Sequence, residues 1–164
     1  MKLRKTVDSV LFTLLVALMS LMVLNVLWQV ASRFILKSPS SFTDELARYL
    51  LIWVGLLGAS YVSGKKMHLA IDIIPSKMEG RGARNLNIFI HLVVALFAFF
   101  AMVWGGINLV YITLTLGQTS ASLGIPLGYV YTAIPLSGLL IIFYSLMNLT
   151  EREETPEEIG RDML

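Results

Sequence analysis

The sequence predicts an all-α integral membrane protein with four transmembrane helices. Of its 164 residues 56% are hydrophobic and 15% are charged, and the mean hydropathy is +0.74. The charged residues gather near the termini and between long apolar runs, because a charge in hydrocarbon is costly. This composition excludes a soluble globular domain.

Four apolar stretches are long enough to cross a membrane, since about 20 helical residues span roughly 30 Å of hydrocarbon. They cover about residues 7–31, 42–63, 86–116 and 127–149. Together they form one membrane domain, residues 1–150, and an acidic tail follows at residues 151–164. The tail is polar enough to stay solvated on the cytoplasmic side.

Each span has its own features. A basic segment precedes the first, but its apolar run is too long for a signal peptide and ends without a small-x-small cleavage site, so we expect a retained helix. The third span is longer than the bilayer requires and should tilt or project. Pro135 lies inside the fourth span and predicts a kink near Ile134.

The distribution of basic residues predicts the orientation. If both termini are cytoplasmic, ten lysines and arginines lie inside and three lie outside. Because positive residues are enriched on the cytoplasmic side, we expect an N-in, C-in topology. A short interfacial segment is expected between the second and third spans, where the apolar residues after His68 are followed by Pro75 and basic residues. An ordinary solvated loop is the alternative there.

Charged residues mark the start of the second span. Ser41 and Asp44 have the spacing of a capping box, and a carboxylate suits a first helical turn. Arg48 lies four residues after Asp44 and three after Glu45, so it can pair with either. We expect an interfacial ion pair that fixes the depth of the helix, with a docking point for another protein as the alternative.

Small residues recur along the second span. Gly55, Ala59 and Ser63 are four residues apart, and Gly58 widens the smooth surface. Such a stripe lets another helix approach closely. In the first span Asn25, Gln29 and Arg33 share one face, and these polar groups are expected to satisfy a neighbouring helix.

Several function classes lack their residues. No acidic residue lies in the middle of a span, no span is broken like a half-helix substrate site, and there is no metal-ligand cluster or nucleotide-binding glycine loop. The chain has no cysteine, and its net charge of +2 forms no basic stripe for nucleic acid. We therefore expect no enzyme, no cofactor and no nucleic-acid partner. Two alternatives stay open: a haem- or quinone-binding membrane anchor, and an autonomous four-helix transporter using Asp8.

The residues around the second span resemble a known family. The segment VLWQVASRFILKSPSSFTDELARYLLIWVGLLGASYVSGKKMHLAID is similar to the signature of the small (Q, or DctQ-like) membrane subunit of tripartite ATP-independent periplasmic (TRAP) transporters. A weaker match is the segment GQTSASLGIPLGYVYTAIPLSG. Phe42 and Asp44 depart mildly from the pattern. The matching residues of the first segment are Arg33, Phe34, Glu45, Ala47, Arg48, Tyr49, Trp53, Gly58, Ala59, Lys65, Lys66, His68 and Asp72.

The resemblance implies a division of labour. In such systems a periplasmic binding protein captures a carboxylate-bearing solute, such as sialic acid or a C4-dicarboxylate. A large membrane subunit then transports it, driven by a sodium gradient. The small subunit would be a scaffold in the bacterial inner membrane, in a roughly one-to-one complex with the large one, with no substrate site of its own. Arg33 and Lys37, on the outer face, are the candidate docking residues for the binding protein, whereas His68 and Asp72 belong to a cytoplasmic motif.

Overall fold

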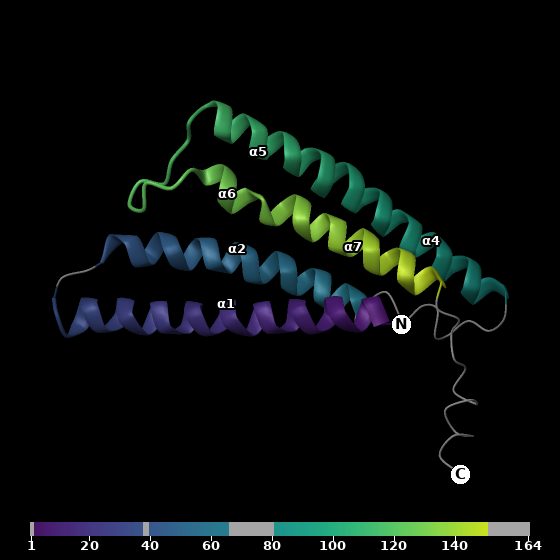
Figure 1. Ribbon diagram of the computed structural model, residues 1–164, viewed down its shortest axis with the longest axis horizontal. Coiled ribbons are helices and arrows are strands. Elements are labelled where there is room, and N and C mark those ends of the chain that lie inside the picture. Colours follow the sequence, from purple (N-terminus) through teal and green to yellow (C-terminus); the bar gives the residue numbers. More distant parts are fainter. Residues whose placement is uncertain (1, 38–39, 66–80, 151–164) are drawn as a thin grey trace, which may run out of the picture.

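The computed structural model describes residues 2–37, 40–65 and 81–150, and all of its spans are helical (Figure 1). Four helical runs in these ranges are long and apolar enough to cross a membrane, which confirms the predicted fold class. The elements are α1 (Lys2–Phe34), α2 (Ser41–Gly64), α4 (Arg81–Phe97), a π-helical segment η2 (Ala98–Trp104), α5 (Gly105–Thr115), α6 (Leu127–Tyr131) and α7 (Ala133–Thr150). The third span is the continuous run α4–η2–α5, and the fourth is α6–α7.

Two predictions lie outside the described residues. One is the interfacial segment between the second and third spans, which would contain His68 and Asp72. The other is the acidic tail at residues 151–164.

The helices form a row and not a closed bundle. α1 packs on α2, α2 packs on α7, and α7 packs on the third span. In Figure 1 this order runs from the purple helix at the bottom to the teal helix at the top. α2 and α7 are therefore the inner helices, while α1 and the third span each leave most of their apolar side chains exposed.

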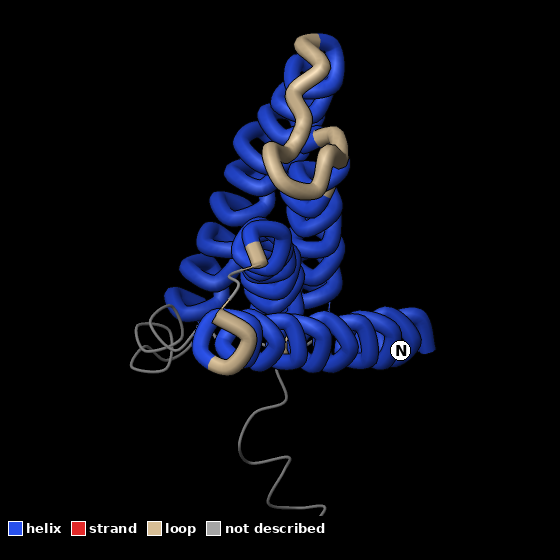
Figure 2. The backbone as a smooth tube through the Cα atoms, turned by 90° about the vertical axis from the view of Figure 1, so that its left-hand side faces the viewer, coloured by secondary structure: helices blue, strands red, loops and turns tan. Residues whose placement is uncertain are grey.

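The two ends of the row differ. The start of α1, the end of α2 and the end of α7 lie at one end, on the right of Figure 1. The α1–α2 turn and the α5–α6 loop lie at the other, which faces the viewer in Figure 2. We call these the Asp8 end and the Glu45 end, after the carboxylate found at each. The chain thus has both described helix termini, Lys2 and Thr150, at the Asp8 end, as an even number of spans requires.

Pro135 interrupts the fourth span. The interruption falls at Thr132, between α6 and α7, which is two residues before the predicted position at Ile134. The proline nitrogen has no hydrogen to donate to the carbonyl of Tyr131, four residues earlier. Beyond the break the ladder resumes, with Leu136 N donating to Thr132 O at 3.2 Å.

Glycines bring the third and fourth spans into close contact. A Cβ added at Gly138 would lie 2.8 Å from Met102 Cβ and 3.2 Å from Ala98 O, both in η2. One at Gly106 would lie 2.9 Å from Pro135 Cδ. The π-helical segment, which no residue pattern predicted, lies at this approach. Glycine here replaces side-chain interdigitation with backbone contact, as is common between membrane helices.

We expect Gly138→Ala to lower the free energy of unfolding of the isolated subunit by about 1–3 kcal/mol, because the added methyl group overpacks the contact with η2. Gly58→Ala is the matched control. Nothing lies within 4 Å of a Cβ at Gly58, so the same change should raise stability by about 0.5–1 kcal/mol through helix propensity. Unfolding in mixed detergent micelles measures both, and equal effects would contradict the packing described here.

Candidate functional site

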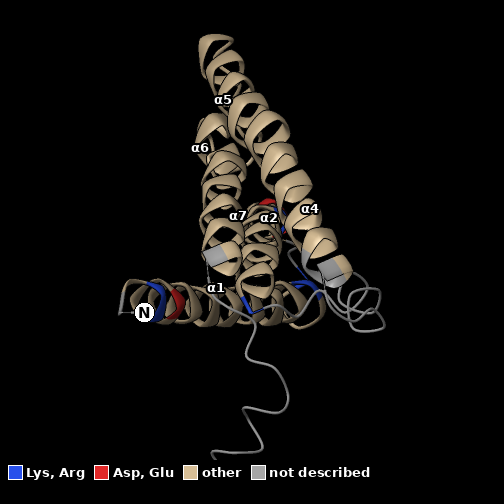
Figure 3. Cartoon of the chain, turned by 90° about the vertical axis from the view of Figure 1, so that its right-hand side faces the viewer, with Lys and Arg blue, Asp and Glu red and all other residues tan. Residues whose placement is uncertain are grey.

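The charged side chains of the described residues gather at the two ends of the row, while in the middle Ser60 Oγ of α2 donates to Ser137 O of α7 at 3.1 Å. The acidic residues of the described ranges are Asp8 at one end and Asp44 and Glu45 at the other. Figure 3 shows blue and red segments on α1 and α2, whereas α5, α6 and α7 carry none. Within the described residues no three His, Cys, Asp or Glu side chains are close enough to hold a metal ion.

Glu45 is bonded to the α5–α6 loop, 75 residues further along the chain. Ser120 Oγ donates a short hydrogen bond to its carboxylate. The backbone N–H groups of Ala121, Ser122 and Leu123 also donate to it, at 3.2, 3.0 and 3.3 Å. Three successive N–H groups around one anion form a concave nest. Glu45 thus holds this loop, and Arg48 is not its partner.

Asp44, one residue earlier, has different partners. Its Oδ2 lies 2.6 Å from Arg48 Nη2, in a pair whose side chains are 53% and 72% exposed. Its Oδ1 accepts a hydrogen bond from Gln29 Nε2 of α1 at 3.1 Å. Of the two carboxylates open to Arg48 from the sequence, the structure selects Asp44. Asp44 also connects α2 to α1.

The capping-box prediction for Ser41 is wrong. The N-cap residue is Ser40, and no side chain caps the first turn. Asp44 points its carboxylate to Gln29 and Arg48 instead of the helix terminus, and Thr43 Oγ1 bonds Ser40 O at 2.7 Å. Tertiary contacts took the place of the local cap.

Asn25 makes the buried polar contact between α1 and α2. Its Nδ2 donates to Thr43 O at 2.8 Å, and the residue is 7% exposed. Asn25 and Gln29 thus both bond α2, as expected for the polar face of the first span. Arg33, on the same face, is exposed, and so is Lys37 in the following turn.

The Asp8 end contains a network that joins three helices. Tyr144 of α7 donates its hydroxyl to Asp8 Oδ1 at 2.6 Å, and Lys65 Nζ lies 3.7 Å from Asp8 Oδ2. Arg4 donates to the carbonyl of Gly64 in a short contact. A Cβ at Gly64 would lie 2.5 Å from the Tyr144 ring, so only glycine admits this approach.

Sequence reasoning missed this network. From the sequence, Asp8 is a candidate residue only for an autonomous four-helix transporter and has no assigned partner. The sequence does hold one signal for it: Asp8 near the start of the first span and Tyr144 near the end of the last span would lie at the same side of the membrane. This signal does not predict a contact unless α1 and α7 are known to pack on the same helix, α2.

The small-residue stripe of α2 is divided between two faces. Ser63 is buried, and its carbonyl accepts a hydrogen bond from Asn148 Nδ2 of α7 at 3.3 Å. Gly55 and Ala59 are exposed, and a Cβ at Gly55 or Gly58 would meet nothing within 4 Å. The N-terminal part of the stripe, from Gly55 to Ala59, therefore does not pack closely against another described helix.

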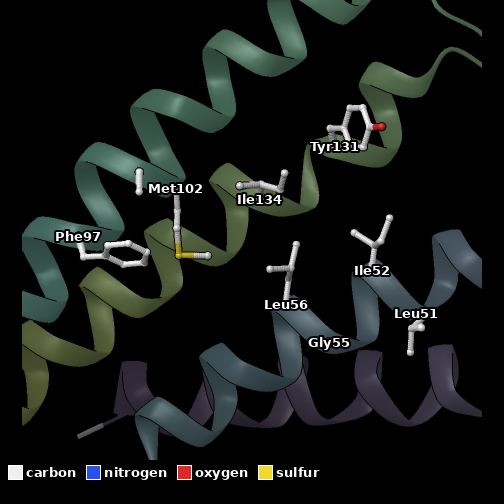
Figure 4. Close-up of a pocket in the computed structure, with 9 residues that line it drawn as sticks. Leu51, Ile52, Gly55, Leu56, Phe97, Met102, Tyr131 and Ile134 are labelled. Carbon is white, nitrogen blue, oxygen red and sulfur yellow. The ribbon is translucent and has the colours of Figure 1, made fainter.

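An apolar groove borders this exposed part of the stripe. It has a volume of about 640 Å³ and lies between α2 and the η2 region, beside α6 and α7. In Figure 4 Ile52 and Leu56 point from α2 toward the last span, and Met102 of η2 lines the groove from the side opposite α2. Its lining contains no charged residue, so the groove suits lipid chains or apolar side chains.

These features define a multi-pass helical membrane protein whose described charged side chains lie at its two ends and whose described middle contains no acidic residue. Its family is shown by a match that covers most of the chain. Residues 22–155 fit the model of the DctQ component of tripartite ATP-independent periplasmic transporters, and the chain belongs to this family.

Three relatives illustrate the match. The chain is 29% identical over 156 residues to the ectoine TRAP transporter small permease protein TeaB of Halomonas elongata, covering 90% of this chain and 80% of that protein. It is 24% identical over 148 residues to the sialic acid TRAP transporter small permease protein SiaQ of Vibrio cholerae, covering 88% and 82%. It is 27% identical over 135 residues to the sialic acid TRAP transporter permease protein SiaT of Haemophilus influenzae, covering 80% of this chain but 20% of SiaT.

We expect the two charged clusters to contribute unequally to stability. Asp8→Ala leaves the buried Tyr144 hydroxyl without its acceptor and should lower the free energy of unfolding by about 1–3 kcal/mol. Arg48→Ala breaks an exposed pair and should cost less than about 1 kcal/mol. Denaturation in mixed micelles compares them, and a larger loss for Arg48→Ala would contradict this order.

Proposed function

We propose that this chain is the small scaffold subunit of a sodium-driven TRAP importer in the bacterial inner membrane. The family match carries the proposal, since it covers residues 22–155. The distribution of polar groups supports a scaffold: the described acidic side chains are at the ends, each bonded to protein groups. A transport pathway for ions through this subunit alone would need ionisable groups between the ends, and the described middle of the spans has no acidic residue.

The names of these three relatives support a solute class. TeaB is named for ectoine, and SiaQ and SiaT are named for sialic acid. Both of these solutes carry a carboxylate group. We therefore propose a small carboxylate-bearing solute for the complete transporter, bound by its other components and not by this subunit.

The principal partner is a large membrane subunit in a one-to-one complex. SiaT supports this, because the part that resembles the present chain makes up 20% of a much longer permease. In such a single polypeptide each copy of the part that resembles this chain comes with one copy of the rest of the permease, which is a one-to-one ratio.

The exposed face of α2 is the proposed contact with the large subunit. Gly55 and Ala59 are exposed there, a Cβ at Gly55 or Gly58 would meet nothing within 4 Å, and the apolar groove lies beside them. Small residues let two helix backbones approach closely in a membrane, where dispersion contacts drive association. A helix of the large subunit on this face would cover the groove as well.

The Glu45 end is proposed to face the periplasm. With this orientation Arg33 and Lys37 are exposed cations on the side from which a binding protein delivers the solute. Among the described residues neither cation has an ion-pair partner, so both are available to an acidic patch on that protein.

We expect Gly55→Leu to reduce recovery of the large subunit in pull-downs from mild detergent by at least about five-fold, because the side chain would block close helix approach. Ala17→Leu, at an exposed position of α1, is the matched control and should leave recovery unchanged. In isolation Gly55→Leu should be at least as stable as the wild type, since nothing lies within 4 Å of a Cβ there and leucine has the higher helix propensity.

Reconstitution tests the function itself. Proteoliposomes containing both membrane subunits, given a sodium gradient and the binding protein, should accumulate the carboxylate solute, whereas this subunit alone should not. Sodium-dependent uptake by this subunit alone would overturn the scaffold role.

The orientation has its own test in this cysteine-free chain. Ser122 is exposed in the α5–α6 loop, so Ser122→Cys should react with an impermeant maleimide in intact cells. Leu3→Cys, at the start of α1, should react only after the cells are permeabilised. The opposite pattern would reverse the proposed topology.

A further inference from the structure

The α5–α6 loop, residues 116–126, is folded although it contains no charged residue and lies at the surface. Ser120 N donates to Ile125 O at 2.9 Å, Gly124 N to Ser120 O at 3.0 Å, and Leu127 N to Gln118 O at 2.9 Å. Gly117 and Gly124 adopt φ values of 62° and 65°, which glycine reaches without strain. The loop thus satisfies much of its own backbone.

The remaining backbone donors at its tip converge on Glu45. Without this carboxylate the N–H groups of Ala121 and Ser122 would have water as their partner, and the loop would lose its connection to α2. Ser120 Oγ also accepts a hydrogen bond from Leu123 N at 3.1 Å, which closes the tip around the carboxylate. Hydrogen bonds to an ionised acceptor are stronger than neutral ones. Glu45 therefore acts as the point that orders the loop.

The outward side of the ordered loop is open. Ala121, Ser122 and Gly124 are exposed, whereas Ser120 is 5% exposed beneath them. These three residues are small and uncharged, so their backbone groups and the Ser122 hydroxyl are accessible to a partner, and Ile125 of the same loop is also exposed.

The charge of the same end selects the kind of partner. Asp44 is paired with Arg48, and the Glu45 carboxylate is enclosed by donors. Arg33 and Lys37 are exposed and have no ion-pair partner among the described residues. This end of the row therefore presents positive charge at the end of α1 and a neutral, ordered loop bonded to α2, and the positive charge complements an acidic surface on a soluble protein.

We infer that Glu45 is a positioning residue for docking of a soluble, acidic-faced binding protein: it does not touch the partner but holds residues 119–126 in the shape that the partner meets. The inference rests on the proposed function and adds to it the surface and the residue that organises it. A loop ordered in advance pays less conformational entropy on binding, so its loss should weaken docking and not the transport step.

Amide hydrogen exchange on the assembled complex in lipid nanodiscs tests the ordering. Glu45→Gln replaces one carboxylate oxygen by an NH₂ group, which cannot accept, and should accelerate exchange at residues 121–123 by at least about ten-fold. Asp44→Asn is the matched control. Asp44 is one residue away and bonds Gln29 and Arg48, not the loop, so this variant should leave exchange in the loop unchanged.

Uptake titrated with the binding protein tests the docking. In proteoliposomes Glu45→Gln should raise the half-saturating concentration of binding protein by about three- to ten-fold, with the maximal rate within about two-fold of wild type. Ser120→Ala removes the hydroxyl from the other side of the same contact and should act in the same direction. If Glu45→Gln does not assemble with the large subunit, the uptake measured with Ser120→Ala tests the docking inference in its place.

The outcomes separate this inference from the proposed function. Faster exchange in the loop with an unchanged half-saturating concentration would show that the loop is not the docking surface. Loss of the large subunit from pull-downs of both variants would place the loop in the contact between membrane subunits, and would also overturn the inference. If the wild-type complex does not respond to binding protein at all, the proposed function fails, and the docking inference fails with it while the exchange result stands.

Discussion

Hydrocarbon offers no hydrogen bonds, so a polar side chain in a membrane domain needs a protein partner or a place at an end of the helices. The acidic side chains of the described ranges have both. Asp8 bonds Tyr144 and Lys65 at one end, and Asp44 and Glu45 bond α1, Arg48 and the α5–α6 loop at the other. The middle of the row has no charged side chain among the described residues. It is held by packing, including the backbone contacts at its glycines, and by the buried hydrogen bond from Ser60 Oγ of α2 to Ser137 O of α7 at 3.1 Å.

The row of helices has a consequence for the scaffold role. α1 contacts mainly α2, and the third span contacts mainly the fourth, so each outer helix is covered on one side. Large apolar side chains such as Phe89, Trp104 and Tyr111 remain exposed along the third span. In a membrane, lipid chains cover such surfaces at no great cost, but a protein partner can replace them wherever its shape fits better. An open row presents more such surface than a closed bundle of the same length, which suits the proposed role of a scaffold.

The number of spans and the location of the charges could be predicted from the sequence, because the thickness of the hydrocarbon sets helix length and the cost of burying charge sets its position. The partners of the charges could not. From spacing alone Arg48 suited Asp44 and Glu45 equally, and the contact that distinguishes them comes from Ser120, far away in the sequence. The small-residue stripe showed a similar limit. Its spacing indicates that something approaches α2 closely. Among the described residues Ser63 of the stripe contacts α7, as do the nearby Ser60 and Gly64, whereas Gly55 and Ala59 stay exposed.

Two neighbouring carboxylates on one turn of α2 face different ways, since successive helical residues are about 100° apart. Asp44 faces Gln29 of α1, and Glu45 faces the loop before α6. One turn of helix therefore connects the first, second and fourth spans at the Glu45 end. Further along, the same helix exposes Gly55 and Ala59, and at its other end Gly64 lies against Tyr144. A soluble partner at the Glu45 end and a membrane partner on the exposed face would thus both contact elements held by α2. Because an unbroken helix transmits position with little deformation, the relative placement of the two partners would be determined by α2 itself, without any moving part in this subunit.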